Sequence, residues 1–214
     1  IRAILVIGTP VTMAGIGFSL IYVLLSRIIN EFGEHHMAAL GVGHRLEGMA
    51  FMVTIGFMVG APTMVGQYVG AGDAAGARRC AHTAAKMCSS IMIPMGLLLF
   101  VFADPLFRIF TDDPQVIEAG VYYLRIQTAV LAFMALEIVY EGAFTGAADT
   151  MPTFWVTGIG TAARIPLAWF LVYPCGMGIG GVWFAIAGTT VVKGLVMMAW
   201  FSRGSWERRI SSTS

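Results

Sequence analysis

Two carboxylates inside one apolar stretch are the residues of this sequence best suited to chemistry. Glu137 and Glu141 are one helical turn apart within residues 116–143, so a helix would place them on one face. A charged side chain in a membrane span costs roughly 2.5–3.5 kcal/mol on insertion scales, which makes such residues functional candidates. Carboxylates this close repel each other when both are ionised, so one can hold a proton. The pair is predicted to load and release H⁺, or to bind Na⁺ with help from carbonyl groups.

Three basic residues also fall inside apolar stretches and leave a second interpretation open. Arg164 and Lys193 lie near the middle of their stretches and need partners, water or a cavity. Either carboxylate of the pair could be that partner, and the acids would then be structural counter-ions. Arg125 could pair with an acid on another helix or extend its charged end outwards.

A cavity wall can be sketched from polar and aromatic side chains near these charges. Aromatic rings and methionines provide a soft lining for a hydrophobic cation, although packing explains them equally well. The predicted wall residues are Tyr22, Phe51, Thr54, Gln127 and Tyr140. Arg45 and Glu47 fall just inside the predicted outer end of residues 40–68, where interfacial charge is one interpretation and a gate or ion pair is the other.

Several other chemistries find no support in the sequence. It contains no GxxxxGK[ST] phosphate loop, no HExxH helix and no GxSxG turn, so we expect no enzyme of those classes. Neither the four histidines nor the three cysteines have metal-ligand or disulfide-framework spacing. We therefore expect no metal and no cofactor apart from the H⁺ or Na⁺ ion itself.

The composition indicates what kind of element must position these residues. The 214 residues are 57% hydrophobic and only 12% charged, and the formal net charge is +1. A soluble domain carries about 25% charged residues, and a nucleic-acid binder needs a basic excess. The chain is therefore predicted to be an all-α, polytopic membrane protein. Each span needs roughly 20 apolar residues, and six can be drawn, at residues 4–26, 40–68, 81–103, 116–143, 153–173 and 178–201.

Charge between the spans predicts the topology. Seven basic residues flank one end of the six spans and three flank the other. Positive charge marks the cytoplasmic side, so both termini are expected in the cytoplasm, with residues 210–214 as a short tail. Asp113 followed by Pro114 is typical of a helix start. Three pairs of glycines four residues apart allow close helix contact: Gly56 and Gly60, Gly66 and Gly70, and Gly142 and Gly146.

Ordered motifs over about residues 1–209 resemble the C-terminal six-helix half of the multidrug and toxic compound extrusion (MATE) family. They begin with the Pro10 helix and ALG at 39–41. They continue with VGQYVGAGD at 65–73, FTDD at 110–113, GAFTGAADTMP at 142–152, RIPLA at 164–168, GIGGVW at 178–183 and RGSW at 203–206. Many family members carry an acid in the first helix of this half, whereas the helix around Phe18, Ser19 and Tyr22 has none.

The resemblance implies a twelve-helix antiporter of the plasma membrane, in bacteria or archaea the inner membrane, made of two six-helix lobes. Such a protein exports drugs and organic cations in exchange for H⁺ or Na⁺, and rocks one lobe against the other. The expected partners are the lipid bilayer, the substrate and a second lobe, supplied by a missing half or a second copy; no nucleic acid is expected. Alternatives are a flippase for lipid or polysaccharide precursors of the same superfamily, or a channel or membrane scaffold.

Overall fold

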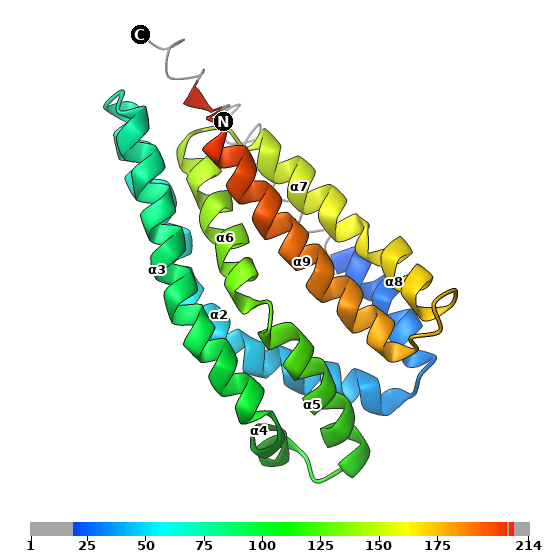
Figure 1. Cartoon of the computed structure of the whole chain (residues 1–214). Coiled ribbons are helices and arrows are strands. Elements are labelled where there is room, and N and C mark those ends of the chain that lie inside the picture. Colours follow the sequence, from blue (N-terminus) through cyan, green and yellow to red (C-terminus); the bar gives the residue numbers. More distant parts are fainter. Residues whose placement is uncertain (1–18, 205, 208–214) are drawn as a thin grey trace, which may run out of the picture.

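A computed structural model describes residues 19–204, 206 and 207, and helices make up almost all of this part of the chain (Figure 1). An apolar helix, Ser19–Asn30, precedes α2. The others are α2 (Glu34–Gly70), α3 (Ala74–Val101), α4 (Ala103–Phe110), α5 (Pro114–Thr128), α6 (Leu131–Gly146), α7 (Met151–Ala162), α8 (Arg164–Val172) and α9 (Ile179–Ser202). The described residues contain no strand, which confirms the all-α class.

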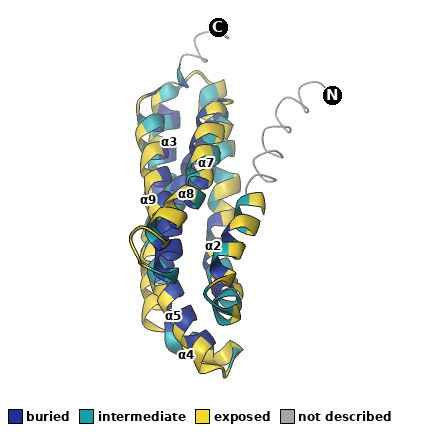
Figure 2. Ribbon diagram, turned by 90° about the vertical axis from the view of Figure 1, so that its right-hand side faces the viewer, coloured by how far each residue is buried: buried dark blue, intermediate teal, exposed yellow. Residues whose placement is uncertain are grey.

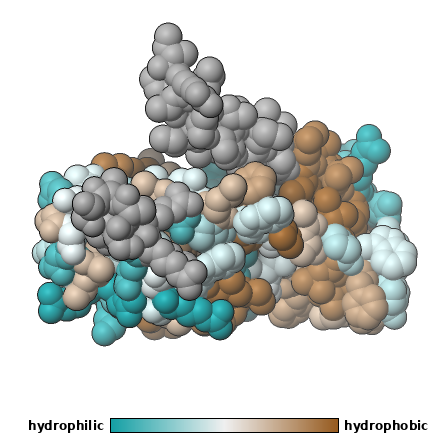
Figure 3. Space-filling view, turned by 90° about the horizontal axis from the view of Figure 1, so that it is seen from above, coloured by the Kyte–Doolittle hydropathy of each residue, from teal (hydrophilic) through white to brown (hydrophobic). Residues whose placement is uncertain are grey.

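Several of these helices are long and apolar enough to cross a bilayer. Among the described residues, four helical stretches are long and apolar enough: α2, α3, α9 and Met151–Val172. A fifth is added if α5 and α6 form one broken span. Most of the predicted first span, 4–26, lies outside the described residues. Large apolar side chains stay exposed on the outer helix faces while the inner faces are buried (Figure 2). Exposed apolar side chains cover much of the right-hand part of Figure 3, the side on which α7 and α8 lie.

The stretch predicted as one span at 116–143 is two helices that meet at a bend of 52°. The Thr128 hydroxyl donates to the carbonyl of Leu124 at 2.8 Å, and a threonine bonded in this way bends its helix. The backbone then tightens, with the amide of Val130 bonded to the carbonyl of Gln127, and α6 begins at Leu131.

A second break divides the stretch predicted at 153–173. The helix is interrupted at Ala163, between α7 and α8. Pro166 has no amide hydrogen to give the carbonyl four residues earlier, which accounts for an interruption at this place. Arg164 becomes the first residue of α8.

The helix starts follow local chemistry. The side chain of Asp113 accepts from the amide of Gln115 at 2.9 Å, with Pro114 next in the chain, as the Asp-Pro sequence predicted. Asp73 accepts from the amide of Gly76 at 2.7 Å and starts α3. That helix ends at Val101, and the short α4 follows and turns across the end of the bundle (Figure 1).

Two apolar clusters hold the helices together, and α6 lies against α2, α3 and α9. The α6 cluster joins buried residues of α2, α3, α6 and α9, among them Val65, Met92 and Phe201. The α5 cluster joins the Ser19–Asn30 helix to α2, α5, α8 and α9, and includes Leu25 and Trp183. Four buried polar side chains lie at the two helix breaks: Gln127 and Thr128 at the α5–α6 bend, and Thr161 and Arg164 at the α7–α8 break.

Only some of the glycine pairs mediate close packing. A Cβ on Gly146 would lie 2.4 Å from the carbonyl oxygen of Pro62, and one on Gly142 would lie 3.0 Å from the Pro62 ring. A Cβ on Gly66 of α2 would lie 3.3 Å from the carbonyl oxygen of Gly146, so this glycine also faces α6. By contrast, a Cβ on Gly56 or Gly60 would meet no atom of the described chain within 4 Å. The close α2–α6 contact thus rests on Gly66, Gly142 and Gly146.

Candidate functional site

A cavity of about 230 Å³ lies inside the bundle, and we call it the central cavity. Its wall takes residues from the Ser19–Asn30 helix, α2, α5, α6, α8 and α9, and includes both sides of the α5–α6 bend. Broken helices at a polar cavity are how membrane bundles expose backbone groups to a ligand. The lining residues are Tyr22, Glu47, Phe51, Tyr123, Gln127, Val130, Leu131, Met134, Glu137, Ile138, Arg164, Ile186, Thr190 and Lys193.

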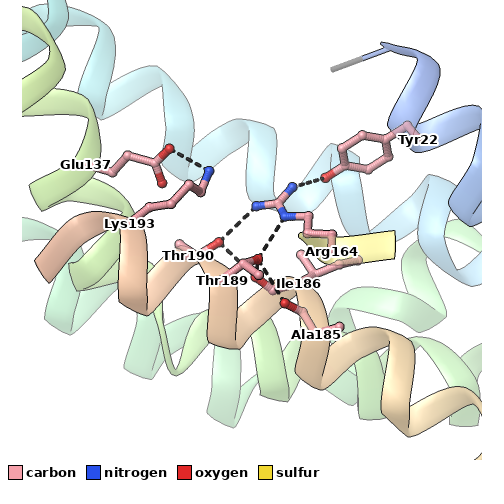
Figure 4. A network of polar contacts seen from close by, with 8 residues as sticks. All are labelled: Tyr22, Glu137, Arg164, Ala185, Ile186, Thr189, Thr190 and Lys193. Carbon is pink, nitrogen blue, oxygen red and sulfur yellow. Dashed lines mark hydrogen bonds and ion pairs between the residues drawn. The ribbon is translucent and has the colours of Figure 1, made fainter. Parts of the chain in front are cut away.

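A buried ion pair forms one side of this cavity. Lys193 Nζ on α9 donates to Glu137 Oε1 on α6 at 2.6 Å, and both side chains are almost wholly shielded from solvent (Figure 4). Two charges withdrawn from water stay ionised only while each has a partner, so this pair depends strongly on both members. The structure thus realises the counter-ion interpretation for Glu137, within a cavity that a small ion could enter.

Arg164 forms a second polar centre on the same wall. Its Nε donates to the hydroxyl of Thr189 at 3.0 Å, and Nη2 donates to that of Thr190 at 3.1 Å. Its Nη1 reaches the hydroxyl of Tyr22 at 3.4 Å, so the guanidinium ties the Ser19–Asn30 helix to α8 and α9 (Figure 4). The threonine hydroxyls donate in turn to carbonyls of their own helix, at Ala185 and Ile186. All three partners are neutral hydroxyl groups, so these contacts do not neutralise the positive charge of Arg164.

Glu47 supplies a second carboxylate to the cavity. The hydroxyl of Tyr123 is hydrogen-bonded to this carboxylate, and the charge of Arg164 acts on it. Its Oε1 atom is buried and has no hydrogen-bond partner in the described part of the chain. Sequence position alone favoured an interfacial charge here. The structure turns Glu47 inward, and its unpartnered oxygen is available to a proton or a cation.

The other predicted acid lies apart from the wall. Glu141 is partly exposed, one turn beyond Glu137, although the charges of Glu137 and Lys193 both act on it. Because α6 turns by about 100° per residue, the two acids share a side of the helix without reaching the same depth in the bundle. The two carboxylates that line the cavity are therefore Glu47 and Glu137, which come from different helices.

The predicted wall residues divide into two groups. Tyr22, Phe51 and Gln127 line the cavity, and Gln127 Nε2 donates to the carbonyl of Trp183 at 3.3 Å. The other two, Thr54 and Tyr140, do not line this cavity. Thr54 is wholly buried and its hydroxyl donates to the carbonyl of Phe51 at 2.6 Å, while Tyr140 faces α3, where its hydroxyl lies 2.7 Å from His82 Nδ1. Helical rotation directs both away from the cavity.

Arg125 lies outside this site, on an exposed face of α5. Its guanidinium carbon is 5.6 Å from the centre of the Phe100 ring. No group of three or more His, Cys, Asp or Glu side chains suited to a metal ion exists among residues 19–204, 206 and 207. The charged residues that sequence reasoning underrated are Glu47, Arg164 and Lys193. The sequence feature that could have identified them is a charged residue inside an apolar stretch.

Fold and site together define a polytopic α-helical membrane protein with charged groups buried around a cavity among its helices. The MatE family model matches residues 10–170 of the chain. The chain belongs to this family.

Relatives among curated proteins agree with this assignment. The probable multidrug resistance protein NorM of Thermotoga maritima is 28% identical over 209 residues, covering 97% of this chain and 45% of the relative. The multidrug and toxin extrusion protein 2 of Homo sapiens is 25% identical over 178 residues, covering 80% of this chain and 29% of the relative. The chain thus spans half or less of the length of these relatives.

Solved structures share the fold. The MATE transporter ClbM in complex with Rb⁺ superposes with a TM-score of 0.88 at 20% identity, over 97% of this chain and 49% of that one. A transporter of the MOP superfamily from Pyrococcus furiosus, described as having a reverse polarity of its binding pocket, gives a TM-score of 0.82 at 20% identity, over 90% of this chain and 43% of that one. The likeness corresponds to one half of each transporter.

Proposed function

We propose that this chain forms one lobe of a secondary antiporter that exports drugs or organic cations in exchange for H⁺ or Na⁺. The observation that carries the proposal is the Glu137–Lys193 ion pair at 2.6 Å on the wall of the central cavity. An ion pair with a purely structural role could be packed tightly between helices, away from any cavity. This one borders open volume, so a cation that enters the cavity can compete with Lys193 for the carboxylate.

The charge balance of the cavity supplies the coupling. Two acids, Glu47 and Glu137, face two bases, Arg164 and Lys193, on one wall. When H⁺ or Na⁺ binds to either acid, the cavity gains a net positive charge and repels an organic cation nearby. Release of the ion restores the balance and removes that repulsion. Such competition between two cations is the exchange that an antiporter requires, because each ligand favours a different state of the same site.

A transport path needs a second lobe. Alternating access rocks one helical repeat against another around a shared site, and the chain covers 45% of the first relative and 49% of the first structural match. We propose that the second lobe is either another segment of the same protein or a second copy of this chain. The lobe would lie in the plasma membrane, the inner membrane of a bacterium or archaeon, with both ends of the chain in the cytoplasm.

The test is ion-driven efflux from the full reading frame that encodes this chain. Vesicles containing the protein should expel ethidium when an inward H⁺ or Na⁺ gradient is imposed. Glu137→Gln and Glu47→Gln should each reduce coupled efflux at least tenfold, whereas Glu141→Gln should reduce it less. A matched control is Glu34→Gln, which neutralises an exposed acid in the first turn of α2, outside the central cavity. Full coupling in both Glu137→Gln and Glu47→Gln would refute the proposed site.

A second candidate is a flippase for lipid or polysaccharide precursors. It is favoured by one observation, that Arg164 and Lys193 both line the cavity and could hold an anionic group. For this function a lipid-linked pyrophosphate should stimulate transport, and Arg164→Gln should abolish the stimulation. Ethidium exchange without any response to the anionic lipid supports the antiporter.

A further inference from the structure

A second hollow lies on the outer surface of the bundle, between α4 and α5, and we call it the α4–α5 groove. Its volume is about 590 Å³. The α5 residues that line it are 114, 117, 118, 121, 122 and 125, which recur every three or four positions and so form one face of the helix. The remaining lining residues are Asp104, Arg108 and Asp112. None of them lines the central cavity.

Charge in the groove is graded along α5. Asp112 and Glu118 lie near the start of the helix, and Arg125 lies two turns beyond Glu118. Asp104 and Arg108 bind each other through two hydrogen bonds, of 2.7 and 3.2 Å, and so largely cancel. The groove therefore has acidic side chains at the end near the start of α5, which we call its mouth, and one positive charge two turns further along the helix.

Arg125 is the key residue of this arrangement. Side chains on a helix lean towards its N-terminus, so the guanidinium extends back towards the mouth, and its charge acts on Asp104 of α4. The ring of Phe100 lies beneath it at 5.6 Å. An exposed arginine that a helix carries into an apolar segment needs an anionic or polar partner at this depth.

Apolar surface continues from the groove along α3. Ile93, Leu97 and Phe100 are exposed by 60%, 63% and 41%, and their spacing places them in one row on the helix. The row begins under the guanidinium of Arg125 and runs away from α4. From the mouth of the groove along α5, and then along α3, the surface presents carboxylates, a guanidinium, an aromatic ring and a row of aliphatic side chains, in that order.

We propose that the α4–α5 groove binds the headgroup of an aminophospholipid, phosphatidylethanolamine. This lipid presents a primary ammonium, a phosphate, a glycerol and acyl chains in the order in which the groove presents their complements. The ammonium would bind Glu118 and Asp112, the phosphate would bind Arg125, and one acyl chain would lie along Ile93, Leu97 and Phe100. The proposal is independent of the transport function, because it uses a different part of the lobe.

The experiment compares phospholipids on the purified full reading frame. Delipidated protein is incubated with equal amounts of phosphatidylethanolamine, phosphatidylcholine and phosphatidylglycerol, and retained lipid is counted by native mass spectrometry. Phosphatidylethanolamine should be retained at least fivefold more than phosphatidylcholine, whose quaternary amine cannot donate hydrogen bonds. It should also exceed phosphatidylglycerol, which lacks the ammonium.

Variants assign the binding to the groove. Arg125→Gln and Glu118→Gln should each remove this preference, while Arg125→Lys should retain part of it. Arg45→Gln removes an exposed arginine of α2 outside the groove and should change nothing. Equal retention of the three lipids, strongest binding of phosphatidylglycerol, or an undiminished preference in Arg125→Gln would overturn the proposal. Thermal unfolding of each variant in detergent shows that the fold is intact, and Arg125→Lys provides the test if Arg125→Gln does not fold.

Discussion

At the scale of single residues, the buried ion pair makes the stability of the lobe depend on two side chains together. Lys193 and Glu137 are each shielded from solvent and share one short hydrogen bond. Removal of one member of such a pair leaves a charge without a partner, whereas removal of both leaves two neutral groups. This asymmetry distinguishes a paired site from two independent charges.

Lys193→Met should therefore lower the free energy of unfolding by about 3–5 kcal/mol, and Glu137→Gln with Lys193→Met should recover much of that loss. Lys86→Met, which removes an exposed lysine of α3, should have little effect. Denaturant titration of the protein in mixed micelles measures all three variants. Simple addition of the two single effects in the double variant would contradict a coupled pair.

A second residue pair gives a prediction about acid pH. Hydrogen bonds from Arg108 hold the pKa of the Asp104 carboxyl below its usual value. A depressed pKa means that the pair stabilises the fold above the unfolded-state pKa, about 3.9, and that this contribution is lost as pH falls through the folded-state pKa. The advantage of the native chain over Asp104→Asn should be constant at neutral pH and shrink on acidification.

Thermal unfolding between pH 7 and pH 2.5 measures this advantage. In an Arg108→Gln background the same Asp104→Asn substitution should give no such acid-dependent difference, because the donor is gone. High salt should also reduce the effect, since both side chains are exposed. An advantage that grows as pH falls would contradict the assignment.

At the scale of helices, close contact between α2 and α6 depends on small residues at particular positions. The backbone of Pro62 occupies the place where a Cβ on Gly146 would stand, whereas open space surrounds Gly56. Gly146→Ala should destabilise the fold by about 1–3 kcal/mol, as overpacking does. Gly56→Ala should be neutral or slightly stabilising, because alanine favours helix. Thermal unfolding in detergent compares the two, and equal effects would contradict this view of the contact.

The helices also show which features a sequence can indicate. Apolar stretches identify helices of membrane type, since hydropathy depends on residue type alone. The bend at 129–130 depends on the side chain of Thr128 and on how α5 and α6 pack against their neighbours, which hydropathy does not measure. The same limit applies to the site: Gln127 on α5 and Tyr140 on α6 were equally plausible wall residues, yet only Gln127 lines the cavity, while Tyr140 faces His82 on α3. Glu47 needed the packing of α2 against α5 to bring it to Tyr123.

At the scale of the whole molecule, one face of α2 is left without a partner in the described chain. Met49, Met52 and Val59 are between 61% and 72% exposed, and Gly56 and Gly60 lie in open space beside them. Lipid could cover such a face. A second lobe that opens and closes against this one would instead expose it to water for part of the transport cycle. The two possibilities differ in how a thiol on α2 reacts.

Cysteine labelling in vesicles distinguishes them. In a background without Cys80, Cys88 and Cys175, Met52→Cys should react with a membrane-impermeant maleimide, because a thiol at the lobe interface meets water and can ionise. Leu97→Cys on α3, also an exposed apolar position, should react at least tenfold more slowly because hydrocarbon surrounds it. Ethidium should slow the reaction of Met52→Cys alone. Equal slow labelling at both positions would place the α2 face in lipid, and the second lobe would then have to meet this one through a different surface.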